Sequence, residues 1–110
     1  MRFLVTTHQK DTYLTIPEET RVKLFEVFAG FIDRNRKAGK CKEIYYLSDM
    51  KGSTSIWELE SSEERARLVL DNPMRDIEDM EIQPVVEWDV GVGTIKEALK
   101  KSARKESNFL

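Results

Sequence analysis

The sequence predicts one α+β domain with four strands, two helices that cover them and a further helix at the C-terminal end. Two patterns support this prediction. Short β-branched and aromatic runs bounded by turn residues are typical of strands, and segments whose apolar residues recur every three or four positions are typical of helices. The length of 110 residues, with 40% hydrophobic and 35% charged residues, also suits a single globular domain.

The first strand and the first helix occupy the N-terminal third of the chain. Residues 2–8, RFLVTTH, predict the strand because β-branched and aromatic residues dominate them. Thr15 and Glu18 have the spacing of a capping box and Pro17 suits a first helical turn, so we expect a helix to begin there. Gly39 is a natural residue to end it. The apolar positions of this amphipathic helix are Val22, Phe25, Phe28, Ala29 and Ile32.

The middle of the chain predicts a β-hairpin. Residues 42–48 and 53–59 have strand composition and are separated by a short polar segment. Gly52 ends that segment, and a glycine can adopt the positive φ that a tight turn requires. We therefore expect the two strands to pair directly.

A second helix and a fourth strand follow. Ser61 and Glu64 predict another capping box, and the helix should end before Pro73 because the residue before a proline resists helical angles. Residues 80–89 predict the strand, in which Pro84 favours an edge position or a bulge.

The C-terminal part predicts one more helix. Gly91 and Gly93 are interpreted as a hinge, and residues 94–105 as a helix with a fraying end. We therefore divide the chain into a barrel domain, residues 1–93, and a basic helix with its tail, residues 94–110.

The element order βαββαβ is that of a ferredoxin-like domain with a four-stranded antiparallel sheet. Two helices can cover only one face of such a sheet, yet apolar residues alternate onto both faces. A second copy of the chain is the simplest cover, so we expect a homodimer or a larger homo-oligomer that pairs sheet to sheet. Consecutive residues that we expect to point to opposite faces include the pairs Leu4–Val5, Tyr45–Tyr46, Ile56–Trp57 and Val85–Val86.

The charge of the chain is unevenly distributed. Eighteen basic and 20 acidic residues give a net charge of −2, which argues against nucleic-acid binding. From Lys96 to the C-terminus five basic residues face two acidic ones, a balance of 5 − 2 = +3. We expect a solvated helix face there, and docking on an acidic surface of a neighbouring subunit is the alternative.

Cysteine and histidine content excludes other classes of site. Cys41 is the single cysteine and His8 the single histidine, so we expect neither an intrachain disulfide nor a zinc site. The N-terminus lacks the apolar core of a signal peptide, and no run is long enough to cross a bilayer. We therefore expect a cytoplasmic protein without a membrane partner.

Three segments carry a further signal, namely KAG at 37–39, SIWEL at 55–59 and DNPMRDIEDMEI at 71–82. The first segment has a glycine, the second a serine–hydrophobic–aromatic–acidic succession and the third a proline. In residue type and spacing, these features resemble the muconolactone isomerase family of dimeric α+β barrels. The resemblance covers roughly residues 2–84. It implies a cofactor-free protein that self-associates through its sheets and moves a proton to shift a double bond in a small unsaturated lactone.

The chain differs from that family at three places. Where the family has basic residues in the first and second strands, this chain has Thr6 and Tyr46. Where the family has a hairpin segment with tyrosine and asparagine, this chain has residues 51–54, KGST. Two hypotheses therefore stay open. One is a cofactor-independent, isomerase-like enzyme acting on a small, mainly apolar carbonyl or lactone compound. The other is a non-catalytic ligand-binding or assembly module on the same scaffold.

Proton transfer would need a group that titrates near neutral pH. Histidine does so without perturbation, which makes His8 a candidate. The strand carboxylates Glu43, Glu58 and Glu87 would do so if enclosed, because burial raises the pKa of a carboxyl group. We predict His8, Glu43 and Glu58 as catalytic residues, with a solvated position as the alternative for each.

Aromatic and hydroxyl side chains of the hairpin are candidates for substrate binding. Tyr45 and Tyr46 point to opposite faces of a strand, so one of them can donate a hydrogen bond to a substrate carbonyl in a given pocket. Packing in the core or in an interface is the alternative for both. With Ser55 and Trp57 of the next strand, they are predicted to bind the substrate.

Overall fold

The computed structural model describes the backbone of residues 1–109 and the side chains of residues 1–105. It confirms the order βαββαβ followed by a C-terminal helix, and adds a 3-10 helix, η1, after the first strand. The elements are β1 (Arg2–Gln9), η1 (Asp11–Thr15), α1 (Glu18–Lys37), β2 (Cys41–Tyr46), β3 (Gly52–Glu58), α2 (Ser62–Leu70), β4 (Glu78–Val85) and α3 (Trp88–Phe109).

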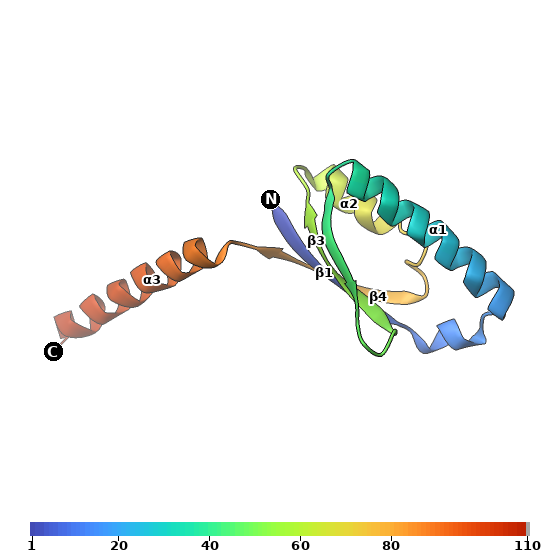
Figure 1. Ribbon diagram of the computed structural model, residues 1–110. Helices are drawn as coiled ribbons and strands as arrows, with labels where there is room; N and C mark the ends of the chain where they lie inside the picture. The colour runs from blue at the N-terminus through green and yellow to red at the C-terminus, as the bar shows by residue number, and fades with distance from the viewer. Residues whose placement is uncertain (110) are drawn as a thin grey trace.

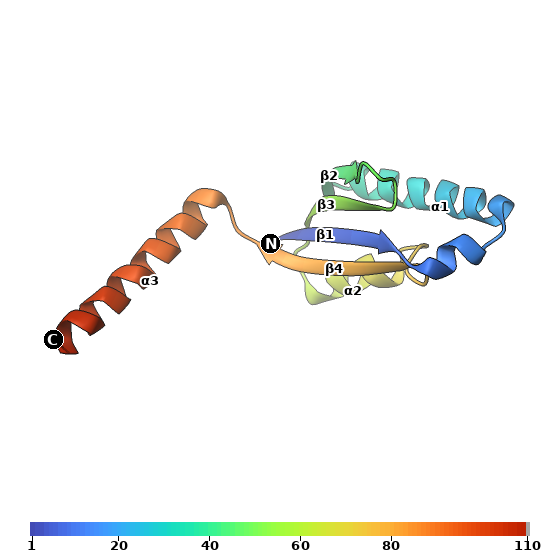
Figure 2. The same cartoon turned by 90° about the horizontal axis from the view of Figure 1, so that it is seen from below.

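The four strands form one antiparallel sheet in the order β2-β3-β1-β4. Helices α1 and α2 lie on the same face of it, which we call the covered face (Figures 1 and 2). Strand β1 is central, and Val5 pairs with Ser55 of β3 on one side and with Ile82 of β4 on the other. Strand β4 lies at an edge, as Pro84 predicts, because proline lacks the amide hydrogen that a second neighbour would need.

The hydrophobic core lies between the covered face and the two helices. Phe31 of α1 packs against Trp57 of β3 with ring centroids 6.2 Å apart, and Trp57 is 2% exposed. Burial of such large apolar surfaces is the main source of stability in a domain of this size. The buried apolar residues are Phe3, Val5, Phe28, Phe31, Ile32, Cys41, Trp57, Leu59, Leu68 and Met74.

The opposite face of the sheet, which we call the open face, is not covered by any helix within residues 1–109 (Figure 1). Apolar side chains do alternate onto it, as predicted, but polar and acidic side chains separate them. Residues that are paired across neighbouring strands point to the same face of the sheet, so the strand register shows which residues lie on the open face. Its residues are Arg2, Leu4, Thr6, His8, Glu43, Tyr45, Thr54, Ile56, Glu58, Asp79, Glu81, Gln83 and Val85.

Two local predictions are wrong in instructive ways. The Thr15 hydroxyl does not cap α1; it donates to the Thr12 carbonyl at 2.6 Å within η1, and Pro17 occupies the N-cap position. In the hairpin turn Met50, not Gly52, has positive φ, at 60°. Gly52 is needed for another reason, because a Cβ there would collide with the Thr7 carbonyl of β1.

Two other turn signals are confirmed. The Ser61 side chain accepts a hydrogen bond from the Glu64 amide at 3.1 Å at the start of α2. The Glu64 carboxylate reaches back to the Glu60 amide at 2.9 Å, one residue before the position that a capping box predicts. Gly39 follows α1 with φ 74°, the left-handed conformation that commonly ends a helix.

The last helix begins earlier than predicted. Strand β4 ends at Val85 and α3 starts at Trp88, so Gly91 and Gly93 lie within the helix and do not form a hinge. The Gly91 amide donates to the Glu87 carbonyl at 2.9 Å. A glycine costs only about 1 kcal/mol in a helix, so it weakens the first turns without stopping them. Leu110, the end of the predicted tail, lies outside the described residues.

Helix α3 stands clear of the sheet and of α1 and α2 (Figures 1 and 2). It gives the chain its elongated dimensions of 69 × 31 × 24 Å. Within the described part of the chain, no helix is both long and apolar enough to span a membrane.

Candidate active site

A pocket of about 230 Å³ lies between the covered face, α1 and η1. The chain crosses this region several times, so β1, β2, β3, β4, η1 and α1 each contribute to the lining. The walls are aromatic and thioether side chains, and a few polar groups point between them. The walls comprise Tyr13, Phe25, Phe28, Tyr46, Met50 and Met74, and the polar lining comprises Gln9, Ser53 and Glu78. Such a mixture is typical of pockets for small, mainly apolar ligands.

Glu78 is the buried acidic group of this pocket. It is the first residue of β4, pairs with Gln9 of β1 and is 9% exposed. Its Oε1 atom is buried without a hydrogen-bond partner among the described residues. Burial raises the pKa of the Glu78 carboxyl because the ionised form loses hydration, and the Thr7 side chain opposes this more weakly. An unpartnered buried oxygen in a pocket suggests a function, because most buried polar atoms are satisfied.

Two tyrosines share the space with Glu78. Burial is the main cause that raises the pKa of Tyr46, and electrostatic interaction with Glu78, then with Tyr13, raises it further. The Tyr46 hydroxyl therefore stays protonated and can act as a hydrogen-bond donor. Its ring stacks on Phe25 of α1, with centroids 6.1 Å apart and planes inclined by 26°. Because Tyr46 is half exposed, it lies at the mouth of the pocket.

The floor beside Glu78 is fixed by a hydrogen-bonded pair. The hydroxyl oxygens of Thr7 on β1 and Ser53 on β3 are 2.9 Å apart, and the Ser53 amide donates to Thr7 Oγ1 at 3.1 Å. Both residues are buried. This pair ties neighbouring strands together and holds the polar end of the pocket in place.

A cationic group lies beside the mouth. The Arg21 guanidinium of α1 lies over the Tyr13 ring, 5.6 Å from its centroid. Its Nε atom is buried and has no hydrogen-bond partner among the described residues. Arg21 lines a shallow hollow that shares Tyr13 and Phe25 with the pocket, so it contributes positive charge next to the entrance.

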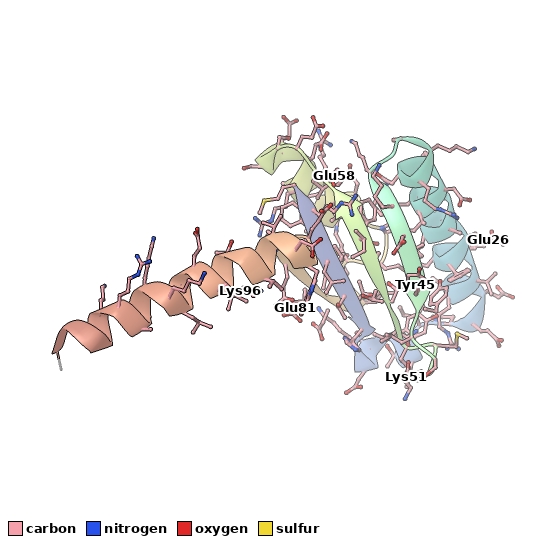
Figure 3. All side chains as sticks on the ribbon, turned by 60° about the vertical axis from the view of Figure 1, so that its left-hand side comes forward. Glu26, Tyr45, Lys51, Glu58, Glu81 and Lys96 are labelled. Carbon is pink, nitrogen blue, oxygen red and sulfur yellow. The ribbon has the colours of Figure 1, made fainter. Side chains whose placement is uncertain are left out.

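The predicted catalytic residues lie on the other side of the sheet. His8 and Glu43 are exposed on the open face. Glu58, labelled in Figure 3, accepts hydrogen bonds from the Met1 amino group at 2.9 Å and from Arg2 Nε at 3.2 Å. The hydrogen bond from the amino group is the main cause that lowers the pKa of Glu58, whereas a base poised near neutral pH requires a raised one. Glu87 is exposed and lines a hollow on the open face.

The predicted substrate-binding residues are divided among three places. Tyr45 is 59% exposed on the open face, where Figure 3 labels it. Trp57 and Ser55 lie in the core, where Trp57 Nε1 donates to Ser55 Oγ at 2.8 Å and Ser55 Oγ donates to the Val5 carbonyl at 3.5 Å. Of the predicted site residues, Tyr46 lines the pocket together with Glu78.

Sequence reasoning missed Glu78 and Tyr13. Glu78 continues backwards the alternation of Met80 and Ile82, the positions of β4 that pack against the core. Extending the predicted strand by two residues would have placed this carboxyl on the covered face. Tyr13 had no comparable signal, because η1 has no periodicity of its own.

No protein-family model matches the chain, and no curated protein does either. Among solved structures, the chain is similar to 5-chloro-2-hydroxyhydroquinone dehydrochlorinase (TftG) from Burkholderia phenoliruptrix, solved in complex with 2,5-dihydroxybenzoquinone. The match covers 81% of this chain and 97% of that chain, with a TM-score of 0.65 and 17% identity. A protein from Agrobacterium tumefaciens matches over 80% of this chain and 96% of its own, with a TM-score of 0.42 and 18% identity. The likeness to the dehydrochlorinase is one of fold alone, and the muconolactone isomerase family of dimeric α+β barrels stays a prediction.

Proposed function

We propose that this chain is a cofactor-independent enzyme that moves a proton within a small, ring-shaped unsaturated carbonyl compound held in the Glu78 pocket. The observation that carries the proposal is the Glu78 carboxyl, which is buried, has a raised pKa and keeps one oxygen unpartnered in a pocket with aromatic walls. A carboxyl whose pKa lies closer to neutral pH is suited to accept and return a proton.

The pocket supplies the two groups that such a step requires. The ionised Glu78 carboxylate removes a proton from the carbon beside the carbonyl, and the C–H electrons form a dienolate. The Tyr46 hydroxyl donates a hydrogen bond to the oxygen on which negative charge accumulates. The Glu78 carboxyl, whose proton exchanges with solvent, then donates a proton to the far end of the dienolate. The double bond has moved, and no oxidant, reductant or water has been consumed.

The dimensions and lining of the pocket favour a single ring. A volume of about 230 Å³ is small for a ligand pocket, and rings such as Phe25 and Phe28 offer flat apolar contact surfaces. The dehydrochlorinase of the same fold was solved with 2,5-dihydroxybenzoquinone, a single ring with two carbonyl groups. Support for this ligand class comes from the pocket, and the shared fold is consistent with it.

The proposal is tested by solvent exchange. The chain is incubated in D₂O with a panel of cyclic enones, unsaturated lactones and hydroxyquinones, and deuterium entry beside the carbonyl is followed by proton NMR. We expect the natural chain to accelerate exchange into at least one compound. Glu78→Gln should lower that rate by at least about 100-fold, because it keeps the shape of the side chain and removes its proton transfer.

A matched control is Asp76→Asn, which removes one negative charge two residues earlier from a side chain that is 88% exposed. It should keep the full exchange rate. If Glu78→Gln stays as fast as Asp76→Asn while His8→Ala or Glu43→Gln loses the activity, the proton carrier lies on the open face and the proposal fails. If ligands shift the NMR signals of the pocket and no compound exchanges, the chain is a binding module.

A further inference from the structure

Two hydroxyl groups lie side by side on the covered face, beneath the Glu78 pocket. Thr7 belongs to β1 and Ser53 to β3, and the strand register pairs them directly. Each residue is 4% exposed, and the two hydroxyl oxygens are 2.9 Å apart, with either of them able to act as the donor. A buried hydroxyl destabilises the fold unless its hydrogen finds an acceptor, so the direction of each hydrogen matters.

Glu78 lies next to Thr7 on the other side of β1. The register pairs Thr7 with Met80 and Gln9 with Glu78, so Thr7 and Glu78 are diagonal neighbours on the covered face. Figure 2 shows β1 between β3 and β4, the strands that carry Ser53 and Glu78. Burial raises the pKa of Glu78, and a hydrogen bond from the Thr7 side chain lowers it by less. The three side chains therefore form a row with Thr7 in the middle, and Glu78 and Ser53 at its two ends both line the pocket.

The hydrogens of this row allow two arrangements. Thr7 Oγ1 accepts a hydrogen bond from the Ser53 amide at 3.1 Å, which holds the oxygen in place and leaves its own hydrogen free to turn. In the first arrangement the Ser53 hydroxyl donates to Thr7, and the Thr7 hydroxyl donates to Glu78. In the second the Thr7 hydroxyl donates to Ser53, and the Ser53 hydrogen points to the pocket. The pair therefore always has one hydrogen to donate, either to Glu78 or to a bound ligand.

We infer that Thr7 and Ser53 form a hydroxyl relay, whose hydrogen bonds turn from Glu78 to the oxygen of the bound ring as the negative charge moves there. This inference rests on the proposed function and makes Ser53 a second donor to that oxygen, beside Tyr46. While Glu78 is ionised, it holds the Thr7 hydrogen, because a hydrogen bond to a charged group is roughly twice as strong as a neutral one. Once Glu78 has taken the proton, the charge lies on the ring oxygen and the Ser53 hydrogen turns to it.

The relay changes no covalent bond. Each hydroxyl keeps its hydrogen and rotates about its C–O bond, and both turn back when Glu78 donates a proton to the ring. Ser53 contacts the ring oxygen and is a catalytic residue, whereas Thr7 acts through Ser53 and Glu78 and is a positioning residue. A donor that turns to the ring only when charge develops stabilises the dienolate more than the starting compound, which is the condition for a faster reaction.

Other charged groups near Glu78 act on it through space and not through this hydrogen bond. The titratable and charged residues of the pocket and of the hollow beside its entrance are Tyr13, Tyr46, Glu18, Arg21 and Glu26. None of them changes when a hydroxyl of the row is removed. Their effect on the pKa of Glu78 therefore stays the same, and the removal of one hydroxyl isolates the relay.

The test combines the exchange assay in D₂O with a carbon-13 NMR titration of the Glu78 carboxyl. Ser53→Ala should slow exchange by at least about 10-fold, because the dienolate loses a hydrogen bond to its charged oxygen. The KM should stay within about twofold, since this bond forms only with the charge. Thr7→Val should slow exchange and raise the pKa of Glu78, because the ionised carboxyl loses a donor, and the pH profile of exchange should move the same way. Thr7→Ser, which restores the hydroxyl, should recover both.

The matched control is Thr6→Val, the same change one residue earlier and on the open face. It should keep the natural exchange rate and the natural pKa of Glu78, and circular dichroism checks that each variant folds. Ser53→Ala decides the matter even if Thr7→Val does not fold.

The relay and the proposed function fail in different ways. If Glu78→Gln abolishes exchange while Ser53→Ala is as fast as Thr6→Val, the relay is wrong and the proposed function stands. If Thr7→Ser stays as slow as Thr7→Val, the role of Thr7 is one of packing and the relay is again wrong. If Glu78→Gln keeps the natural rate, or if no compound exchanges, the proposed function is wrong and the relay fails with it, because no charge leaves Glu78.

Discussion

The covered and open faces of this sheet carry similar residue types in very different surroundings. Tyr45 and Tyr46 are neighbours in β2, yet one is exposed on the open face and the other stacks on Phe25 beside the pocket. Burial raises the pKa of Glu78 on the covered face, whereas hydrogen bonds to cations lower the pKa of Glu58 on the open face. Successive residues of a strand point to opposite faces of the sheet. The face on which a tyrosine or a carboxyl lies therefore decides its burial, its pKa and whether it can take part in proton transfer.

The largest expected difference between the two faces is in the free energy of unfolding that a substitution on each face costs. Trp57→Ala should lower the free energy of unfolding by about 3 to 5 kcal/mol, because it leaves a cavity in the core and the Ser55 hydroxyl loses a donor. Tyr45→Ala, on an exposed side chain, should cost about 1 kcal/mol or less. Urea unfolding followed by circular dichroism measures both. A cost near 3 kcal/mol for Tyr45→Ala would show that the open face is packed in solution.

A smaller effect is expected on ligand binding. Tyr46→Phe removes the hydroxyl at the mouth of the pocket and should weaken binding of 2,5-dihydroxybenzoquinone, used as a probe, by about 3- to 10-fold through the loss of one hydrogen bond. Tyr45→Phe makes the same chemical change on the open face and should alter the affinity by less than about twofold. Titration followed by NMR distinguishes them. If the two substitutions weaken binding equally, the ligand does not distinguish the covered face from the open face, and the pocket is not its binding site.

The smallest effect concerns the pH dependence of stability. The pKa of Glu78 is raised above 4.5, so at lower pH the carboxyl is neutral in both the folded and the unfolded chain. As pH rises, the unfolded chain loses this proton first, and stability falls until the raised pKa is passed, by about 1.4 kcal/mol for each unit of the shift. Glu78→Gln should abolish this part of the pH dependence of urea unfolding above about pH 4.5. An unchanged slope would contradict the burial of the charge.

The fold was predictable because its signals are local and regular. Strand composition, the spacing of Phe28 and Ile32 in α1, the Ser61 cap and the helix end at Gly39 all agree with the structure. The extent of α3 was not predictable from Gly91 and Gly93, because a small helical penalty is outweighed by the hydrogen bonds of a long helix.

The candidate site was less predictable than the fold. The sequence shows that Glu43 and Glu58 alternate with apolar residues, but it does not show which of the two alternating sets of side chains faces the helices. The assignment depends on the registers that pair Val5 with Ser55 and with Ile82. Glu78 was missed because the strand was predicted to begin two residues too late, and Tyr46 was found because its residue type suits either face.

The most direct test of the account is a carbon-13 NMR titration of the carboxyl carbons of Glu78 and Glu58 in the same sample. The account predicts that Glu78 titrates above the ordinary glutamate value of 4.5 and Glu58 below it, because one is buried and the other is hydrogen-bonded to cations. A small ring ligand that binds in the pocket should shift the titration of Glu78 alone. If Glu78 titrates at or below the pKa of Glu58, the covered face does not hold a proton-transferring carboxyl and the proposed site is wrong.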